Sequence, residues 1–141
     1  MSDHSITSLI EKLEEAEVGD QDLSLEVNLA LEGGEAVPKM TNYTMEPCWA
    51  IRRPNAAYVG GFENGPNYPV TQSLDAALEL TERIWPHVMW RVGHDPDDGS
   101  FKAQIVTAQK PGDPPAVHTN AATAPLALCA AILRAKSEAR V

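Results

Sequence analysis

The residues best suited to binding chemistry form an aromatic and arginine cluster in the first half of the sequence. Its members are Trp49, Arg52, Arg53, Tyr58, Phe62 and Tyr68. Aromatic faces stack on nucleobases, and guanidinium groups grip phosphates, so the cluster predicts a site for a nucleotide-like ligand. Arg91, on the polar side of a later strand, is a further candidate for this site. The competing interpretation is that the aromatics only pack this segment and the arginines pair with nearby acids.

A second candidate surface is acidic and lies at the N-terminus. Residues 1–36 hold ten of the 20 acidic residues and one of the 11 basic residues, so this segment alone carries the whole formal charge of −9. Glu11, Glu14, Glu15 and Glu17 are the candidate partner-binding residues. Opposite charges attract at long range and raise association rates, so the segment could attract a basic partner. A solvated outer face of amphipathic helices is the alternative explanation.

No set of residues predicts catalysis or metal binding. A serine or cysteine nucleophile needs a base and an orienting group, and the sequence marks none; Cys129 sits in an apolar helical run and is expected to be buried. The run from Asp95 to Gly99 lacks the glycine and glutamate positions of a calcium loop and reads as a hairpin turn. The four histidines have no partner at ligand spacing. We therefore expect no enzyme, no cofactor and no metal site.

Length and composition set the broad class. A chain of 141 residues with 43% hydrophobic content is long enough for one globular domain. No apolar run approaches the roughly 20 residues of a membrane span, and no secretory signal is recognisable, so a cytoplasmic protein is expected. A pI near 4.8 argues against binding duplex DNA, which requires a basic face. It does not argue against a local basic pocket, because residues 37–141 are neutral overall.

Three stretches organise the first half and the middle of the chain. Residues 1–36 form an acidic segment with a helix over 5–18 and an ambiguous stretch over 20–32, in which alternating leucines favour a strand and helical spacing with caps favours a helix. We favour the helix. Residues 37–72 are a proline- and glycine-rich insertion with short strands at 48–52 and 56–62 and a turn at Asn64-Gly65. Residues 73–141 follow as the core, all within one compact domain.

The core segment shows clear periodicity. Residues 73–85 read as a helix capped by Ser73, and residues 123–139 as a helix capped by Thr123. Between them, residues 87–93 and 100–108 alternate as an antiparallel hairpin, and residues 116–119 as a third strand. The sequence thus predicts an α/β (α+β) fold, with a small, mainly antiparallel sheet sandwiched by helices. The expected core residues are Leu78, Ile84, Trp90, Phe101, Ile105, Leu126, Cys129 and Leu133, and the expected exposed residues are Arg52, Arg53, Asp97 and Asp98.

The second half also resembles a known family. The segment from Ser73 to Leu80, the sequence Ile84-Trp85-Pro86, the tryptophan-bearing strand at 89–92 and the closing run at 121–135 are similar to the phage α-β-α sandwich domain family. The closing run, with its set of small residues around Cys129, is the most specific of these blocks, and residues 44–70 depart from the pattern as an insertion. The resemblance implies a phage-encoded protein with an antiparallel sheet between helices, acting in an infected bacterial cell. The family supplies no catalytic residues.

Two functional hypotheses follow. The first is a phage counter-defence protein that sequesters a nucleotide-derived immune signal of the host through Trp49, Arg52, Arg53, Tyr58, Tyr68 and Arg91. The second is an acidic inhibitor, comparable to an anti-CRISPR, that binds a basic host defence effector through Glu11, Glu14, Glu15 and Glu17. A structural role in the virion is a weaker third alternative. Self-association is a further expectation if the leucine-rich stretch at 23–31 leaves an apolar side exposed.

Overall fold

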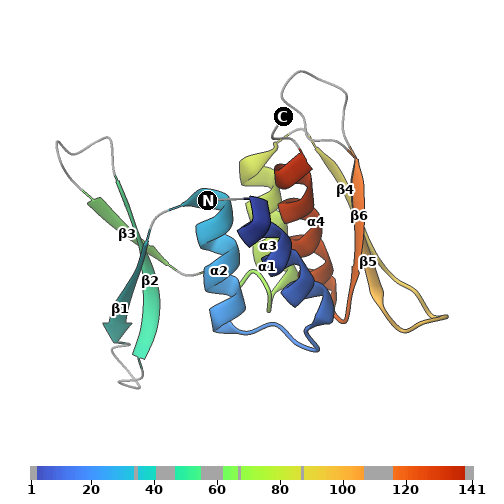
Figure 1. Ribbon diagram of the computed structural model, residues 1–141, viewed down its shortest axis with the longest axis horizontal. Coiled ribbons are helices and arrows are strands. Elements are labelled where there is room, and N and C mark those ends of the chain that lie inside the picture. The colour runs from blue at the N-terminus through green and yellow to red at the C-terminus, as the bar shows by residue number, and fades with distance from the viewer. Residues whose placement is uncertain are drawn as a thin grey trace.

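The computed structural model describes residues 3–33, 35–40, 47–54, 62–66, 68–86, 88–106 and 116–138. The described chain contains four helices and six strands (Figure 1). In chain order these are α1 (Asp3–Glu15), α2 (Gln21–Glu32), β1 (Glu35–Met40), β2 (Pro47–Pro54), β3 (Phe62–Pro66), α3 (Leu74–Ile84), β4 (Met89–His94), β5 (Phe101–Val106), β6 (Val117–Ala121) and α4 (Ala124–Glu138).

The strands form two antiparallel sheets, with the helices between them. One sheet has the order β1-β2-β3 and the other the order β4-β5-β6. The first sheet lies beside α2, and the second lies beyond α4 on the opposite side of the helical layer (Figure 1). The predicted mixed α+β class with antiparallel pairing is confirmed, and the structure has two small sheets where one sheet sandwiched by helices was expected.

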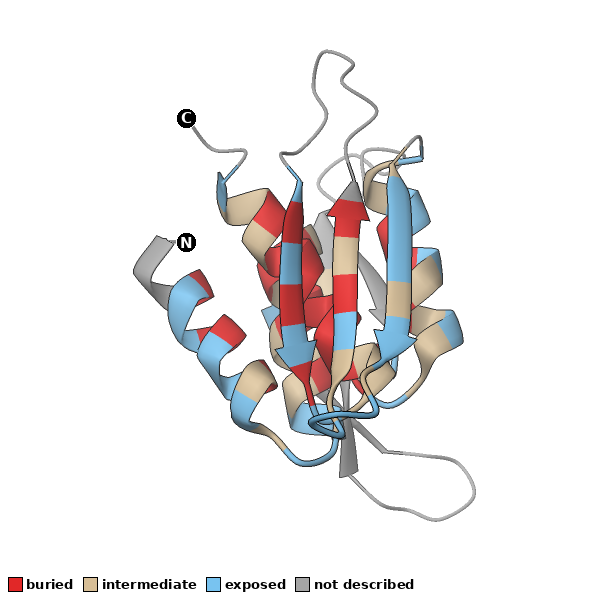
Figure 2. Cartoon of the chain, turned by 90° about the vertical axis from the view of Figure 1, so that its right-hand side faces the viewer, coloured by how far each residue is buried: buried red, intermediate tan, exposed pale blue. Residues whose placement is uncertain are grey.

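The hydrophobic core lies between the helices and the inner face of the β4-β5-β6 sheet. The central helix α4 is buried along most of its length, and Leu126, Cys129 and Leu133 are fully buried. The sheet contributes Ala103 and Ile105 from β5 and Val117 from β6. The alternation on β5 and β6 puts small and branched apolar side chains inward and polar side chains outward, so the outer face of this sheet is exposed (Figure 2).

Capping residues set the helix boundaries. Asp20 accepts a hydrogen bond from the backbone N–H of Leu23 at 2.7 Å, which fixes the start of α2 and confirms the helical interpretation of residues 20–32. Ser73 caps α3 through the N–H of Ala76. Thr123 accepts from the N–H of Leu126 at 3.4 Å, at the start of α4. Each predicted helix is therefore present, and its ends differ from the predicted ones by at most three residues.

Two predictions for the insertion are wrong. Asn64 and Gly65 lie within β3, paired with Arg52 and Ile51 of β2, and do not form a turn. Residues 35–40, for which the sequence pattern predicts no strand, form β1. Pro38 is accommodated because β1 is an edge strand, where a missing N–H can face away from the ladder.

One predicted core residue is misplaced. Trp90 is 37% exposed, whereas Ile105, its partner in the β4–β5 register, is fully buried. The reason is position in the sheet: β5 is central and covered by α4, whereas β4 is an edge strand whose residues are mostly exposed.

Leu78, Ile84 and Phe101 are partly buried and pack against the core. Asp97 and Asp98 are exposed as predicted, and Arg52 is partly buried.

Candidate functional site

A group of exposed acidic residues lies at the end of α1, in the loop that follows it and in the first turn of α2. We define the acidic surface as Glu11, Glu15, Glu17 and Asp22, all exposed. Val18, at the middle of the connecting loop, is 67% exposed and adds an apolar side chain among these carboxylates.

The position of the acidic surface follows from the packing of α1. Ile6, Leu9, Ile10 and Leu13 occupy one stripe of the helix and are buried in the core. The opposite side must therefore face solvent, and it carries Glu11 and Glu15 at i, i+4 spacing. Like charges at this spacing destabilise a helix slightly, so their presence is not explained by the stability of α1.

The structure separates Glu14 from the other three predicted glutamates. Its carboxylate lies 3.1 Å from Nη2 of Arg134 on α4, and the two side chains are 29% and 36% exposed. Nη1 of Arg134 also donates to the carbonyl of His118 on β6 at 3.2 Å. Glu14 therefore ties α1 to α4 and β6, and its charge is neutralised within the molecule.

Basic side chains near the N-terminal segment form ion pairs with acidic residues outside the acidic surface. Four ion pairs join Lys12 to Glu26, Arg52 to Glu35, Arg83 to Glu32, and Arg134 to Glu14. Within the described residues, the four carboxylates of the acidic surface form no ion pair. Within that part of the chain, no basic side chain neutralises their charge.

The loop that carries Glu17 and Val18 is held in place by a buried polar network. The hydroxyl of Thr71 donates to the carbonyl of Asp20 at 2.9 Å and lies 2.7 Å from the hydroxyl of Ser24. The backbone N–H of Thr71 donates to the Ser24 hydroxyl oxygen at 3.1 Å. Gly19 packs so closely that a Cβ added there would lie 1.9 Å from the Thr71 carbonyl oxygen. The loop is thus preorganised, which lowers the entropy cost of binding through it.

The predicted nucleotide site is only partly within the described residues. Tyr58 lies outside them, as do the side chains of Trp49 and Arg53. Arg52, on β2, pairs with Glu35 at 3.5 Å. Arg91 lies on β4, in the sheet on the other side of the helices from β2, so the structure does not bring Arg52 and Arg91 together (Figure 1).

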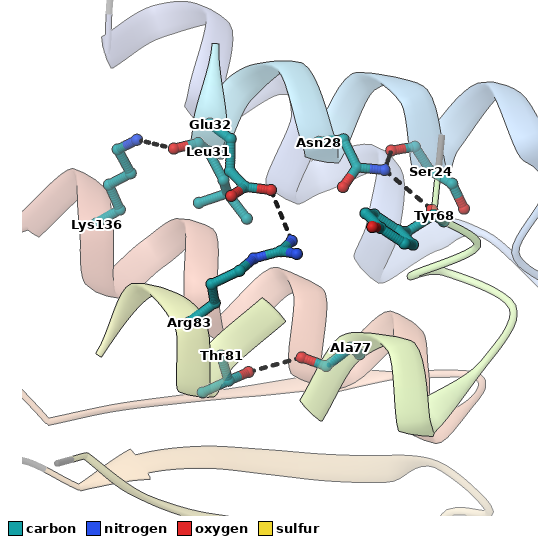
Figure 3. Close-up of polar contacts among 9 residues, drawn as sticks. All are labelled: Ser24, Asn28, Leu31, Glu32, Tyr68, Ala77, Thr81, Arg83 and Lys136. Atoms are coloured by element: carbon teal, nitrogen blue, oxygen red, sulfur yellow. Dashed lines mark hydrogen bonds and ion pairs between the residues drawn. The ribbon is translucent and has the colours of Figure 1, made fainter. Parts of the chain in front are cut away.

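Tyr68 belongs to a different group of residues from the one that the sequence indicated. The guanidinium of Arg83 lies 5.3 Å from the centre of the Tyr68 ring and pairs with Glu32 at 2.8 Å (Figure 3). The Tyr68 carbonyl accepts from Nδ2 of Asn28 at 2.9 Å. The sequence does not single out Arg83, because the pattern of α3 indicates only a packing helix and no spacing connects residue 83 with residues 32 and 68.

The structure offers no nucleophile or metal-ligand cluster in its described part. Cys129 is fully buried, its thiol donates to the Val70 carbonyl at 3.2 Å, and burial raises its pKa well above the usual range, so the thiol stays protonated. His94 packs against Phe101, with ring centroids 5.0 Å apart. Among the described residues, no group of three His, Cys, Asp or Glu side chains could hold a metal ion. No described helix is long and apolar enough to cross a membrane.

Comparisons with protein-family models, with curated proteins and with solved structures find no match for this chain.

Proposed function

We propose that this chain is a non-catalytic binding protein that presents its acidic surface to a basic region of another protein. In the phage setting that the sequence resemblance implies, the partner is a nucleic-acid-binding effector of host defence, and binding inhibits it. Effectors of this kind carry basic grooves for the phosphate backbone, and a preorganised row of carboxylates competes for the same grooves.

One observation carries this proposal: Glu11, Glu15, Glu17 and Asp22 are exposed and form no ion pair within the described residues. Exposed carboxylates of like charge repel one another and lower the stability slightly, and a role in association would account for this cost. The exposed side chain of Val18, next to Glu17 in the same loop, supplies an apolar contact. The carboxylates then raise the association rate in a salt-dependent way, and the apolar contact lowers the dissociation rate of the complex.

The experiment is a quantitative affinity purification from bacterial cells with matched variants. One variant carries Glu11→Gln, Glu15→Gln and Glu17→Gln. The control carries Glu79→Gln, Glu82→Gln and Glu138→Gln, three exposed acids on α3 and α4. Both variants change the net charge by the same amount. We expect proteins with basic surfaces to be retained by the wild type and the control and lost from the first variant. Equal retention by both variants would reject the acidic surface as the binding site.

A second candidate function is sequestration of a nucleotide-derived immune signal. The observation in its favour is that Tyr68 is 37% exposed and has the Arg83 guanidinium against its ring, a pairing that can bind a base and a phosphate together. Glu32 weighs against it, because its carboxylate is 2.8 Å from the same guanidinium and would repel a phosphate. Calorimetry with cyclic dinucleotides and ADP-ribose tests the idea. Absence of heat for every compound excludes it, and binding that survives Tyr68→Ala places the ligand elsewhere.

A further inference from the structure

The edge of β4 is the least protected part of the β4-β5-β6 sheet. Within the described chain, β4 pairs with β5 alone, so its other edge is open. It also carries two of the large exposed hydrophobic side chains, Met89 at 59% and Trp90 at 37%. Open, apolar strand edges invite pairing with another strand, and proteins usually cover or charge them.

The opposite edge of the same sheet is protected. On β6, the carbonyl of His118 accepts a hydrogen bond from Nη1 of Arg134, and α1 contacts the strand. The residues of β4 are mostly exposed, and even Trp90, on the face that β5 turns toward the core, is 37% exposed. One edge of the sheet is therefore covered and the other is left free.

The hydrogen-bonding groups on the free edge follow from the hairpin between β4 and β5. The N–H of Asp95 donates to the Ser100 carbonyl at 2.8 Å, and the Asp95 carbonyl accepts from Gly99, whose positive φ of 74° forms a bulge. Bonding alternates along an antiparallel ladder, so Arg91 and Gly93 also direct their backbone groups toward β5. The backbone N–H and C=O groups of Trp90, Val92 and His94 then point away from β5, toward the open edge.

We propose that two copies of this chain dimerise by antiparallel pairing of their β4 strands, centred on Val92. This register places Trp90 opposite His94 of the second copy, and all the outward backbone groups pair, giving about six hydrogen bonds across the axis. Trp90 thereby reaches the His94–Phe101 aromatic pair of the second copy, on the inner face of the continuous six-stranded sheet.

The charge of Arg91 favours this register, and it indicates that the strand pairing with the β4 edge is the β4 strand of a second copy. Centring the pair on Arg91 would place the two arginines directly opposite each other, which is destabilising. Centring it on Val92 instead places Arg91 opposite Gly93, which has no side chain, with Asp95 two positions further along on the same face. The strand is thus complementary to itself in one register. Glycine in a strand interior often marks a place where another chain approaches closely.

Position 93 allows a sharp test, because a Cβ added to Gly93 meets nothing within 4 Å in the single chain. The variants Gly93→Arg and Gly93→Glu should therefore fold as the wild type does, which thermal unfolding checks. In the dimer, Gly93→Arg sets an arginine against Arg91 of the other copy, whereas Gly93→Glu sets a carboxylate there. Each contact occurs twice because of the twofold symmetry.

The measurement is sedimentation velocity of the full chain from about 1 μM to about 500 μM. We expect a monomer–dimer equilibrium whose dissociation constant rises about tenfold in Gly93→Arg and falls about tenfold in Gly93→Glu. Arg91→Glu combined with Gly93→Arg should restore dimerisation. Net charge alone predicts the reverse order, because Gly93→Arg brings the chain closer to neutrality. A wild type that stays monomeric throughout, or the same dissociation constant in both variants, overturns the proposal.

Discussion

Glu14 on α1 and Arg134 on α4 form an ion pair at 3.1 Å, which makes Glu14 a structural residue among glutamates that otherwise face solvent. Glu11 and Glu15 lie on the same helix, one turn before it and one residue after it, yet they have no basic partner in the described chain. The rotation of α1 on the core explains the difference, since residue 14 borders the buried stripe and points toward α4. The contact with Arg134 therefore distinguishes Glu14 from the other three glutamates.

This division predicts opposite consequences for two identical substitutions. Glu14→Gln removes a partly exposed ion pair that also orients Arg134 toward His118, and we expect a loss of about 1 kcal/mol in the free energy of unfolding. Glu11→Gln should leave that free energy within about 0.5 kcal/mol of the wild type or raise it, because it relieves repulsion from Glu15. Urea unfolding measures both. Equal effects of the two substitutions would contradict the assignment.

The buried network around Thr71 predicts that its hydroxyl matters more than another buried threonine hydroxyl. Thr71→Val leaves the buried Ser24 hydroxyl without its side-chain partner and should cost about 1–3 kcal/mol. The Asp20 carbonyl loses the bond from Thr71 but keeps the one from the Ser24 N–H. Thr81→Val is the matched control, because its hydroxyl bonds only to the Ala77 carbonyl of its own helix. That carbonyl keeps its helical hydrogen bond, so the control should cost under about 1 kcal/mol. Similar losses in the two variants would show that the network is not the cause.

The close approach at Gly19 predicts a strong dependence on side-chain size. Gly19→Ala places a Cβ 1.9 Å from the Thr71 carbonyl oxygen, so the loop and residue 71 must separate, at a cost above about 2 kcal/mol. Gly93→Ala meets nothing and should be neutral or stabilising. Thermal unfolding distinguishes the two. A neutral Gly19→Ala would mean that the loop is not fixed against residue 71.

The hairpin turn predicts a measurable carboxyl titration. The side-chain hydroxyl of Ser100 at 2.6 Å and its backbone N–H at 2.8 Å donate to Asp98, and they lower the pKa of this carboxyl below its usual 3.8. A lowered pKa in the folded state contributes stability above the unfolded pKa, and this contribution is lost as the pH falls through the folded value. Ser100→Ala should raise the Asp98 pKa toward 3.8, as followed by carboxyl carbon NMR. A pKa that does not move would exclude the hydroxyl as the main cause.

The sequence predicted the helices and the second sheet because these are governed by local signals. The caps at Asp20, Ser73 and Thr123, together with periodic apolar residues, mark these elements without reference to the rest of the chain. The exposure of Trp90 was not predictable, because alternation gives the face on which a side chain lies but not whether its strand is central or at an edge.

The candidate surface was predictable only in part. Counting charges located the acidic segment, and helical spacing placed Glu11 and Glu15 together. The pairing of Glu14 with Arg134 joins residues 120 positions apart, and the contact of Arg83 with Tyr68 and Glu32 likewise depends on how α2 and α3 pack. Contacts between distant segments leave no pattern in local spacing. The sequence therefore could not show that Glu14 forms an ion pair while Glu11 and Glu15 do not.

The measurement that tests the central claim most directly is the binding of a fluorescein-labelled, arginine-rich peptide, followed by fluorescence anisotropy at several salt concentrations. We predict that the combined variant Glu11→Gln, Glu15→Gln, Glu17→Gln weakens binding about tenfold and flattens its salt dependence. The charge-matched control Glu79→Gln, Glu82→Gln, Glu138→Gln should change the affinity less than about twofold. Equal weakening by the two variants would show that only net charge matters, and would contradict a binding role for the acidic surface.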